Sequence, residues 1–349
     1  MWLFGNKPES AETNLLGFTH NFHREKTQKI NTKPSLDTLD EGFVNCANCG
    51  MEIDIGSYQG LSIGRCPHCE TPLFIPLLIK EYWLYEPLGG GGMGSVYRAM
   101  HCVNEDVDFA VKVLPRKRKN DRFLMESLIN EAKICWELGE HQHLNKVVDF
   151  GLDGDEYFAV FEFIEGTRLD QLIDSPVKRP EKQIVLWGMQ ILSAEQHMYN
   201  KGFIFRDLKP QNIMIDKNGN AKLFDFGLAM SIDEALNNTS NQIQGSPYYL
   251  PPERIVGTGE SQHSEIYSLG MVMFHVLAKT PYYSADDIKT LVSKHVVSLR
   301  VNQVKSKLPH KTNPKLVEVI EKMIARLPEN RYATYKEVAG ELFKIYNAA

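Results

Sequence analysis

Four polar side chains near the middle of the chain have the types needed to handle a phosphorylated substrate. Asp207, Lys209 and Asn212 stand in the stretch FRDLKPQN, and Asp225 follows shortly after in DFG. The Asp207 carboxylate could accept or orient a hydroxyl proton, and the Lys209 ammonium could balance charge on a phosphoryl group in transfer. Asn212 and Asp225 offer hard oxygen ligands, which Mg²⁺ prefers. Their order and spacing predict a site that handles ATP with magnesium.

A glycine-rich stretch upstream, LGGGGMGSVYRA at 88–99, supplies the backbone that such a site needs. Glycine lets the chain approach phosphates because no Cβ stands in the way. By itself the stretch is more often a simple turn between strands. Here the next strand-like run, FAVK, ends at Lys112, and this strand–loop–strand–lysine order favours a nucleotide-binding loop.

Together these stretches resemble the eukaryotic-type (Hanks-type) serine/threonine protein kinases. FRDLKPQN resembles the catalytic loop of that family, and DFG at 225–227 resembles its metal-binding turn. Gly89, Gly91, Gly94 and Val96 match its G-x-G-x-x-G-x-V loop. The resemblance implies an α+β, two-lobed kinase fold, with a small β-rich N-lobe followed by a large helical C-lobe.

The resemblance implies that Lys112 holds the α- and β-phosphates of ATP and pairs with an acid on the next helix. A helix is predicted at 123–138, and Glu131 has the expected register. Glu126 is a competing partner, and an ordinary solvated helix acid is the plain alternative for Glu131.

Adenine is expected at the run YFAVFEFIEG, which resembles the strand and hinge of the family. Phe161 would lie at the back of the pocket, and Glu162 and Ile164 would offer backbone groups to the purine. An ordinary buried strand is the alternative. The expected ATP-binding residues are Leu88, Gly89, Gly91, Gly94, Val96, Ala110, Lys112, Glu131, Phe161, Glu162 and Ile164.

In the family template, Asp207 is the base or hydroxyl-orienting group and Lys209 contacts the γ-phosphate. Asn212 and Asp225 bind Mg²⁺ or Mn²⁺. A lysine two residues after the catalytic acid resembles serine/threonine kinases, because tyrosine kinases usually differ there. We therefore expect transfer of the γ-phosphoryl group to serine or threonine.

The stretch GSPYYLPPE at 245–253 is similar to the segment that receives the protein substrate. Ser246 replaces the usual threonine, and Pro251 replaces an alanine. The resemblance implies that Glu253 pairs with Arg331 and ties two parts of the C-lobe together. A surface salt bridge is the alternative for that pair.

Two residues depart from the family pattern. Phe205 replaces histidine and is expected to stack on Phe226, which precedes Gly227, so that activity survives. Glu265 replaces the aspartate that braces the catalytic loop through backbone hydrogen bonds. Its extra methylene is expected to loosen that bracing.

Arg206, directly before the catalytic acid, is typical of kinases controlled by phosphorylation of the activation loop. A phosphate opposite this arginine could order the loop through charge-assisted hydrogen bonds. Ser231, Thr239 and Ser240 are the candidate acceptors. We favour Thr239 or Ser240 because they lie nearest the substrate segment in the sequence.

Four of the six cysteines form two C-x₂-C pairs, which is typical of a zinc ribbon. Cys46 and Cys49 make the first pair, and Cys66 and Cys69 make the second. His68 is expected to be a bystander, and Cys102 and Cys135 are expected to pack as small hydrophobic residues. Free thiols or disulfides remain the alternative for the cluster.

The chain therefore reads as three segments. Residues 1–42 are expected to be flexible, 43–79 to form the zinc ribbon, and 81–346 to form the kinase domain, with its N-lobe at 81–164 and its C-lobe at 165–346. The basic run at 115–122 is expected to be a solvated loop rather than a docking patch.

Composition limits the partners and the location of the 349-residue chain. It is 43% hydrophobic and 24% charged, with a net charge of −5, which gives no general reason to expect nucleic acid or an anionic membrane. From 43 to 79 the only basic side chain is Arg65, so a protein contact is favoured over nucleic acid for the ribbon. No signal peptide or apolar run of about 18–20 residues is present, and we expect a cytoplasmic protein.

Three functions are consistent with these observations. The first is an active serine/threonine kinase with a structural zinc ribbon. The second is a weakly active kinase-like scaffold that binds ATP and acts through protein contacts, which Phe205 and Glu265 favour. The third, a zinc-dependent nucleic-acid binder with an auxiliary kinase domain, is disfavoured by the charge of the ribbon.

Overall fold

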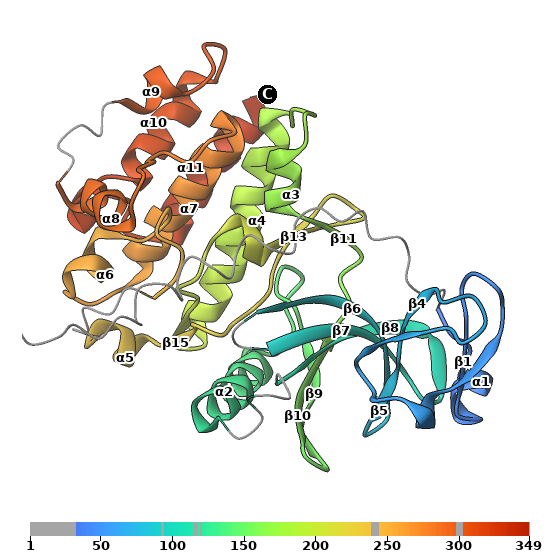
Figure 1. Cartoon of the computed structure of the whole chain (residues 1–349). Coiled ribbons are helices and arrows are strands. Elements are labelled where there is room, and N and C mark those ends of the chain that lie inside the picture. Colours follow the sequence, from blue (N-terminus) through green and yellow to red (C-terminus); the bar gives the residue numbers. More distant parts are fainter. Residues whose placement is uncertain are drawn as a thin grey trace, which may run out of the picture. The chain divides into compact units, whose positions relative to one another are not determined.

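The computed structural model describes residues 33–91, 94–114, 118, 121–238, 244–297 and 303–348. Residues up to 129 together with 148–163 belong to an N-terminal unit, and residues 130–147 with 164–349 belong to a C-terminal unit. Strands dominate the first unit and helices dominate the second, as an α+β fold requires (Figure 1). Helix α2 (Arg122–Leu138) crosses the boundary between them.

The N-terminal unit is built on a six-stranded sheet. Its strands are β5 (Leu77–Ile79), β6 (Tyr82–Gly91), β7 (Gly94–His101), β8 (Asn104–Val113), β9 (Val147–Asp153) and β10 (Glu156–Glu162). The order across the sheet is β5-β6-β7-β8-β10-β9. Leu84, Ala99, Val111 and Phe158 are buried together on one face, because side chains alternate between the two faces of a strand.

The cysteine-rich module folds as two short hairpins within the same unit. β1 (Phe43–Asn45) pairs with β2 (Glu52–Asp54), and β3 (Ile63–Arg65) pairs with β4 (Pro72–Phe74). A 3₁₀ turn, Ile55–Ser57, follows β2. Val44, Ile53, Leu73 and Ile75 make a small core around the cysteines.

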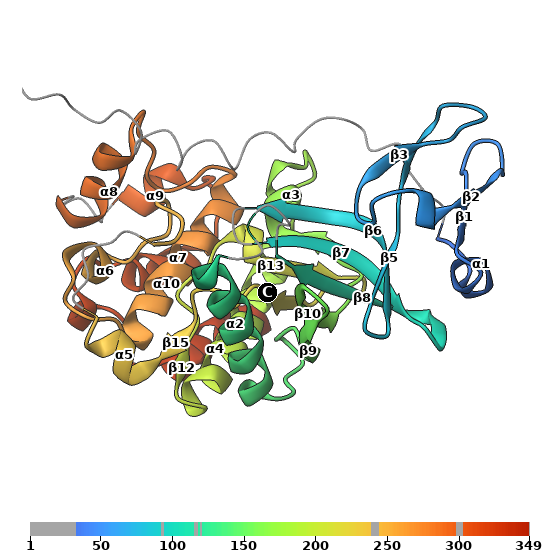
Figure 2. The same cartoon turned by 60° about the horizontal axis from the view of Figure 1, so that its bottom comes forward.

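The end of the predicted ribbon belongs to the large sheet. Strand β5 pairs antiparallel with β6, with Leu77 opposite Leu84 and Ile79 opposite Tyr82 (Figure 2). Pro76 interrupts the apolar run because proline lacks a backbone N–H for a sheet ladder. The ribbon therefore continues directly into the sheet that carries the glycine-rich hairpin.

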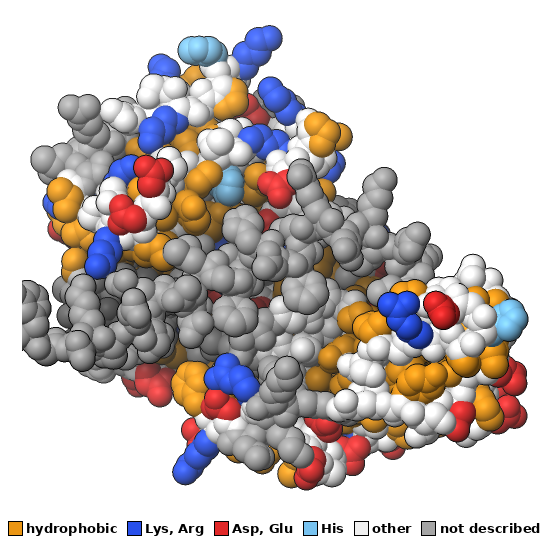
Figure 3. Space-filling model, viewed as in Figure 1, with side chains coloured by type: hydrophobic (Ala, Val, Ile, Leu, Met, Phe, Trp, Pro, Cys, Tyr) orange, Lys and Arg blue, Asp and Glu red, His pale blue; other side chains and the backbone are white. Residues whose placement is uncertain are grey.

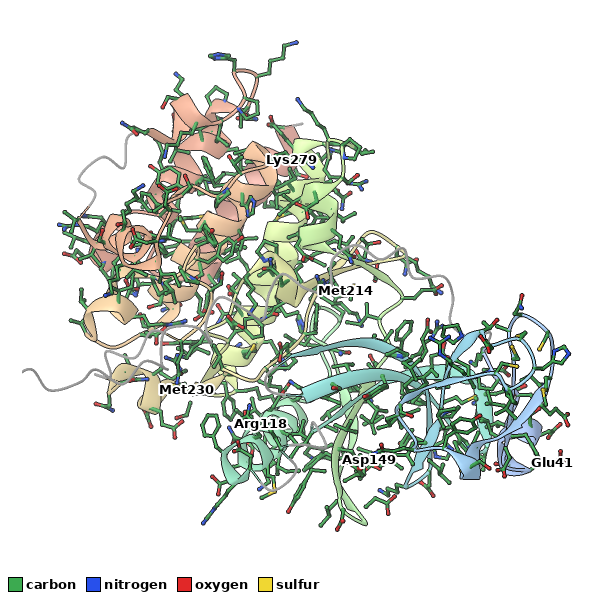
Figure 4. The ribbon with its side chains drawn as sticks, in the orientation of Figure 1. Glu41, Arg118, Asp149, Met214, Met230 and Lys279 are labelled. Carbon is green, nitrogen blue, oxygen red and sulfur yellow. The ribbon has the colours of Figure 1, made fainter. Side chains whose placement is uncertain are left out.

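Side chains reinforce this junction. The rings of Phe74 and Tyr97 stack at 5.6 Å, and Tyr97 lies on β7 next to Val96. The Lys80 ammonium lies 2.6 Å from the Asp149 carboxylate on β9, a residue that Figure 4 labels. The small module consequently packs on the sheet through Phe74, and the Lys80–Asp149 ion pair fixes the turn that follows β5.

The expectation of a flexible segment up to residue 42 needs correction. Helix α1 (Leu36–Asp40) begins at Ser35, whose hydroxyl accepts a hydrogen bond from the Thr38 N–H. Leu39 is buried against Trp83, which lies on β6. The helix forms because this apolar residue finds a partner on the sheet, which the local composition does not show. Residues 1–32 lie outside the described residues.

The C-terminal unit is mainly helical. Its helices are α3 (Leu169–Asp174), α4 (Glu181–Asn200), α5 (Ile232–Leu236), α6 (Pro252–Val256), α7 (Gln262–Ala278), α8 (Ile288–Val297), α9 (Val304–Lys307), α10 (Pro314–Met323) and α11 (Tyr335–Ala348). Helix α7 is apolar on most sides and buried, and it packs against α4 and α10. Helix α4 also packs against α11.

Short strands and turns carry the polar stretches of this unit. They are β11 (Gly166–Arg168), β12 (Phe203–Ile204), the 3₁₀ turn Pro210–Asn212, β13 (Ile213–Asp216), β14 (Ala221–Leu223), β15 (Met230–Ser231) and the 3₁₀ turn Pro328–Asn330. Strands β11, β13 and β14 form one sheet, and β12 pairs with β15. The FRDLKPQN stretch thus runs between β12 and β13.

Lys279 caps helix α3 from the far end of α7 (Figure 4). Its ammonium donates hydrogen bonds to the carbonyls of Leu172, Ile173 and Ser175 at 2.9–3.1 Å. These carbonyls lack partners within a helix end, so a cation there stabilises them. Among the described helices, none is both long and apolar enough to cross a membrane.

Candidate active site

The strand register places four of the expected ATP-binding residues on one face of the sheet. Val96 lies opposite Lys112, and Ala110 lies opposite Phe161. Directly opposed residues point to the same side, and so do residues two apart along one strand. Val96, Ala110, Lys112 and Phe161 therefore share the face opposite to the hydrophobic core of this unit.

The glycine-rich stretch forms the tip of the β6–β7 hairpin. Gly89 pairs with Val96, and Gly91 pairs with Gly94. A Cβ added to Gly94 would lie 3.3 Å from Cγ of Lys112 and 3.1 Å from the Val113 carbonyl. A larger residue at 94 would therefore press on the Lys112 side chain and on the Val113 carbonyl.

The other expected nucleotide-binding residues do not all lie on this face of the sheet. Leu88 is 44% exposed and lies at an irregularity in the β6–β7 ladder. Glu162 ends β10 opposite Phe109, so its side chain faces away from the row that holds Phe161. Ile164 follows β10 and begins the C-terminal unit. The pairing of Lys112 with Glu131 joins the two units and stays a prediction.

Three of the four central polar residues contact one another in the C-terminal unit. The Lys209 ammonium lies 2.6 Å from Oδ2 of Asp207, and the Asn212 amide donates to the same oxygen at 2.8 Å. The Asn212 amide also donates to the Asp207 carbonyl at 3.0 Å. The 3₁₀ turn Pro210–Asn212 brings Asn212 back onto the loop. Asp207 is 8% exposed, so its carboxylate is fixed in direction.

Burial raises the pKa of Asp207 above its ordinary value of 3.8, and the nearby Lys209 ammonium partly offsets this effect. The negative charge of Asp225 raises the pKa further. A carboxyl with this balance is suited to accept or orient a proton.

Asp225 and Glu131 lie near the glycine of the DFG turn. A Cβ built on Gly227 would lie 3.5 Å from Oδ1 of Asp225 and 3.7 Å from Oε2 of Glu131. Asp225 has a positive φ of 65°, which is uncommon outside glycine and recurs at functional sites. Glu131 is 3% exposed, which argues against the alternative of a solvated helix acid.

Phe205 fills a buried position next to the DFG turn. Its ring lies 5.6 Å from that of Phe226, and the two planes meet at 79°, so the contact is edge-to-face rather than stacked. Both side chains are 1% exposed. The replacement of histidine by Phe205 thus keeps the packing beneath the loop.

Glu265 reaches the 205–212 loop in spite of its longer side chain. Both of its carboxylate oxygens accept from the Arg206 N–H at 3.1 Å. Arg206 has a positive φ of 67°, and this contact holds it there. Burial raises the pKa of Glu265 to about 7, although the Arg254 cation opposes the shift. Glu265 therefore contacts the backbone of this loop as expected, through a single N–H, that of Arg206.

Glu195 on α4 is a second buried acid in this region, and sequence reasoning did not single it out. It is 2% exposed, and neither carboxyl oxygen has a hydrogen-bond partner among the described residues. Burial, and then the charge of Glu265, raise the pKa of Glu195 well above its ordinary value. The Glu195 carboxyl is consequently harder to ionise in the folded chain than in the unfolded chain.

The Glu195→Gln variant should be more stable than the wild type, by a margin that grows with pH. Above pH 4.5 the unfolded carboxyl ionises, while the raised pKa makes the folded carboxyl harder to ionise. Each pH unit up to the folded pKa then costs the wild type up to about 1.4 kcal/mol, and glutamine is spared this cost. Urea unfolding between pH 5 and about 8 measures the difference. Glu318→Gln on the exposed face of α10 is the control. A difference in unfolding free energy between Glu195→Gln and the wild type that stays the same at every pH would contradict the assignment.

The predicted substrate segment begins close to Asp207. A Cβ added to Gly245 would lie 3.4 Å from Oδ1 of Asp207. The Ser246 carbonyl accepts from the Tyr249 N–H at 3.1 Å, which forms a turn just after this point. The chain therefore brings Gly245, at the start of this segment, alongside the Asp207 carboxylate.

Glu253 and Arg331 form a bidentate pair. Arg331 donates from Nη1 and Nη2 to the two Glu253 oxygens at 2.7 and 2.9 Å. Their side chains are 7% and 0% exposed, so this is not a surface salt bridge. Arg331 also donates to the carbonyls of Ala325 and His263. The pair anchors the end of the predicted substrate segment among the helices of this unit.

Thr239 and Ser240, the expected phosphorylation sites, lie outside the described residues. Most of the basic run at 115–122 does as well. The third candidate, Ser231, begins helix α5 as the N-cap of a capping box with Glu234. Its hydroxyl therefore has a structural use.

The four clustered cysteines come together as the spacing predicts. Their sulfur atoms all lie within 4.8 Å of one another. Cys46 and Cys69 are 3.6 Å apart, and so are Cys49 and Cys66. Tetrahedral zinc with Zn–S bonds of about 2.3 Å separates its sulfurs by about 3.8 Å. The group has the donor type, number and spacing for Zn²⁺, and His68 is not part of it.

The two cysteine turns have matching backbone bonds. The Gly50 N–H donates to the Cys46 carbonyl, and the Glu70 N–H donates to the Cys66 carbonyl, each at 2.9 Å. Both Gly50 and Glu70 have positive φ. The repeated geometry presents two sulfurs from each turn to one point. On the viewed face of this unit, acidic side chains line the lower margin and basic ones are few (Figure 3).

Comparison with known proteins shows similarity to protein kinases. The sequence model named "Protein kinase domain" matches residues 82–343. A probable serine/threonine-protein kinase of Clostridium perfringens is 31% identical over 271 residues, which are 77% of this chain and 39% of that protein. The serine/threonine-protein kinase PrkC of Bacillus subtilis is 29% identical over 272 residues, which are 77% of this chain and 41% of that protein. The chain spans about two fifths of the length of these curated relatives.

Proposed function

The chain belongs to the protein kinase domain family, and on this premise we propose that it is an ATP-dependent serine/threonine kinase. It transfers the γ-phosphoryl group of ATP to hydroxyls of protein substrates. The observation that carries the proposal is the arrangement around Asp207. A buried carboxylate is held by Lys209 and Asn212, and the segment expected to receive substrate passes beside it.

Each of these groups has a use in phosphoryl transfer. Asp207 orients the attacking hydroxyl and accepts its proton, because its carboxylate is buried and fixed. Lys209 balances the charge that spreads over the γ-phosphoryl oxygens. The position of Lys209, two residues after the acid, favours serine and threonine over tyrosine as acceptors.

ATP and Mg²⁺ or Mn²⁺ are the cofactors that the family implies, and the residues present fit them. Asp207 holds the amide nitrogen of Asn212, so the amide oxygen is the atom left to bind a metal ion. Asp225 supplies a carboxylate next to the DFG turn. Both are hard oxygen ligands. The bound ion supplies neutralisation of phosphate charge.

The nucleotide contacts of the N-terminal unit follow from its strand register. Lys112 is the cation proposed for the α- and β-phosphates, below the hairpin tip that contains Gly91 and Gly94. Ala110 and Phe161 lie beside one another on the same face and are proposed to contact adenine. The backbone groups of Glu162 and Ile164 remain the proposed partners of the purine edge.

Phosphate transfer from labelled ATP tests the proposal. The purified chain with Mg²⁺ and a generic protein substrate should produce phosphoserine and phosphothreonine. The Asp207→Asn variant should lose this activity. Absence of transfer by the wild type, together with normal ATP binding, would favour the alternative of a weakly active scaffold. Phe205 and Glu265 are the residues that favour that alternative.

We further propose that the cysteine cluster holds structural Zn²⁺ and that the module contacts a regulatory protein. Its continuity with the sheet that bears the glycine-rich hairpin supports a regulatory role. Nucleic acid is a poor partner, because Arg65 is the only basic residue of 43–79. Binding of RNA or DNA by the full chain, with a salt dependence whose slope Arg65→Ala lowers by about one, would overturn this choice.

Two finer parts of the proposal concern location and control. A cytoplasmic location is supported by the six cysteines, none of which is in a disulfide. Phosphorylation at Thr239 or Ser240 remains a prediction that mass spectrometry after incubation with ATP and magnesium can check.

A further inference from the structure

The arginine that precedes the catalytic acid already has a charged partner inside the fold. Arg206 donates from Nε and Nη2 to Oε1 of Glu260 at 2.9 and 2.7 Å. The two side chains are 4% and 2% exposed. A guanidinium with two hydrogen bonds to one buried carboxylate is held in place beside an opposite charge.

Glu260 is shared with a second arginine. Arg254, on helix α6, donates from Nε to Oε2 of Glu260 at 2.6 Å. Its Nη1 donates to the backbone carbonyl of Arg206 at 2.6 Å and lies 3.4 Å from that of Gln244. We call Arg206, Glu260 and Arg254 the Glu260 bridge. It joins the catalytic loop to the start of the substrate segment.

The backbone fixes Glu260 in this position. The Glu260 N–H donates to the Ala235 carbonyl at 2.9 Å. A Cβ added to the preceding Gly259 would lie 2.3 Å from the Leu236 carbonyl, and Gly259 has a φ of +84°. No other residue fits there without moving helix α5. The carboxylate is thus built into the loop rather than supplied by a mobile side chain.

The Arg206 guanidinium already has a buried anion within hydrogen-bond distance, although Arg254 shares that anion. Two guanidinium groups face the Glu260 carboxylate, and Glu265 accepts from the Arg206 N–H. A phosphate directed at Arg206 would have to displace a buried, doubly bonded carboxylate. Displacement of one partner from a buried ion pair is strongly unfavourable.

We propose that Glu260 is the built-in counter-ion of Arg206 and that, with Arg254, it positions the catalytic loop without a phosphate on the activation loop. Glu260 and Arg254 are positioning residues, because they act on Asp207 through Arg206 and the loop backbone. The inference rests on the proposed kinase function and concerns the control of that same site. It predicts a kinase that is active before any phosphorylation at Thr239 or Ser240.

The first test compares two forms of the wild type with a variant that lacks both hydroxyls. Phosphatase-treated protein, verified by mass spectrometry, and Thr239→Ala/Ser240→Ala should keep kcat within about threefold of ATP-incubated protein. A loss beyond about tenfold in either one would overturn the inference while leaving the kinase function intact. Inactivity of all forms would instead overturn the proposed function, and this inference with it.

The second test asks whether Glu260 acts through Arg206. Glu260→Gln and Arg206→Gln should each lower kcat by about 10–100-fold, because a misplaced loop costs rate, with the KM for ATP changed by less than about threefold. The kcat of the double variant should lie within about threefold of the kcat of the less active single variant. If the fold-loss of kcat in the double variant equals the product of the two single losses, Glu260 does not act through Arg206. Glu318→Gln is the matched control, and thermal melting confirms folding.

If Glu260→Gln does not fold, the phosphate-free wild type still decides the question. Its activity does not depend on any substitution in the bridge. Full activity supports the built-in counter-ion, and activity that appears only after loop phosphorylation excludes it.

Discussion

Replacing Asp207 with asparagine should lower kcat for phosphate transfer by about 10²–10⁴-fold, the usual contribution of a positioned proton acceptor. Asparagine has the same size but cannot take a proton, and its amide nitrogen cannot accept from Lys209 and Asn212 as the carboxylate does. ATP affinity should change little because Asp207 is not among the expected nucleotide contacts. Initial rates at saturating ATP and a fluorescent-nucleotide titration measure the two quantities.

Asp286→Asn, an exposed change of the same type, is the matched control and should keep the wild-type rate. The pH dependence gives a second check. Burial raises the pKa of Asp207 above 3.8, so wild-type kcat should fall as the pH drops through that raised value. The residual activity of Asp207→Asn should lack this acid limb. If the Asp207→Asn variant has the same kcat as the wild type, Asp207 is not the proton acceptor.

Removal of zinc should destabilise the whole N-terminal unit, not the cysteine module alone. Structural zinc contributes on the order of 10 kcal/mol to the folding of small zinc modules. The core of the module is formed around Cys46 and Cys66, and β5 continues it into the large sheet. Loss of the metal therefore removes support from β6 and β7, which carry the glycine-rich hairpin.

Metal analysis and thermal unfolding test this result. The wild type should hold one zinc per chain, and Cys49→Ser or a strong chelator should remove it and lower the melting temperature. His68→Ala should keep both the metal and the stability, since His68 is outside the cluster. Cys102→Ser is a second control, because Cys102 packs near the sheet without joining the four sulfurs. Zinc-free wild type with unchanged melting would contradict the zinc assignment.

Several local features could be predicted from the residues because short spacing controls them. Asp207, Lys209 and Asn212 lie within one loop, so their contacts depend on a few backbone angles. The two C-x₂-C turns likewise set the sulfur positions of each pair. Alternation along β7, β8 and β10 places Val96, Lys112 and Ala159 in one row.

The boundary of the small module could not be read in the same way. Leu77 and Ile79 look like the end of the ribbon, but their partners Leu84 and Tyr82 lie on the next strand. Helix α1 is only a few residues long and depends on Trp83 for its burial. Short elements have little intrinsic stability, so distant packing decides whether they form.

The sequence by itself determined the chemistry of this protein and the order of its functional groups. Those groups sit in short stretches whose covalent spacing limits their geometry. Only the tertiary structure decided which charges are buried and paired. Arg206 and Glu260 are 54 residues apart, and Arg331 and Glu253 are 78 apart. The environment of a charge depends on the segments that fold around it, and no local pattern records them.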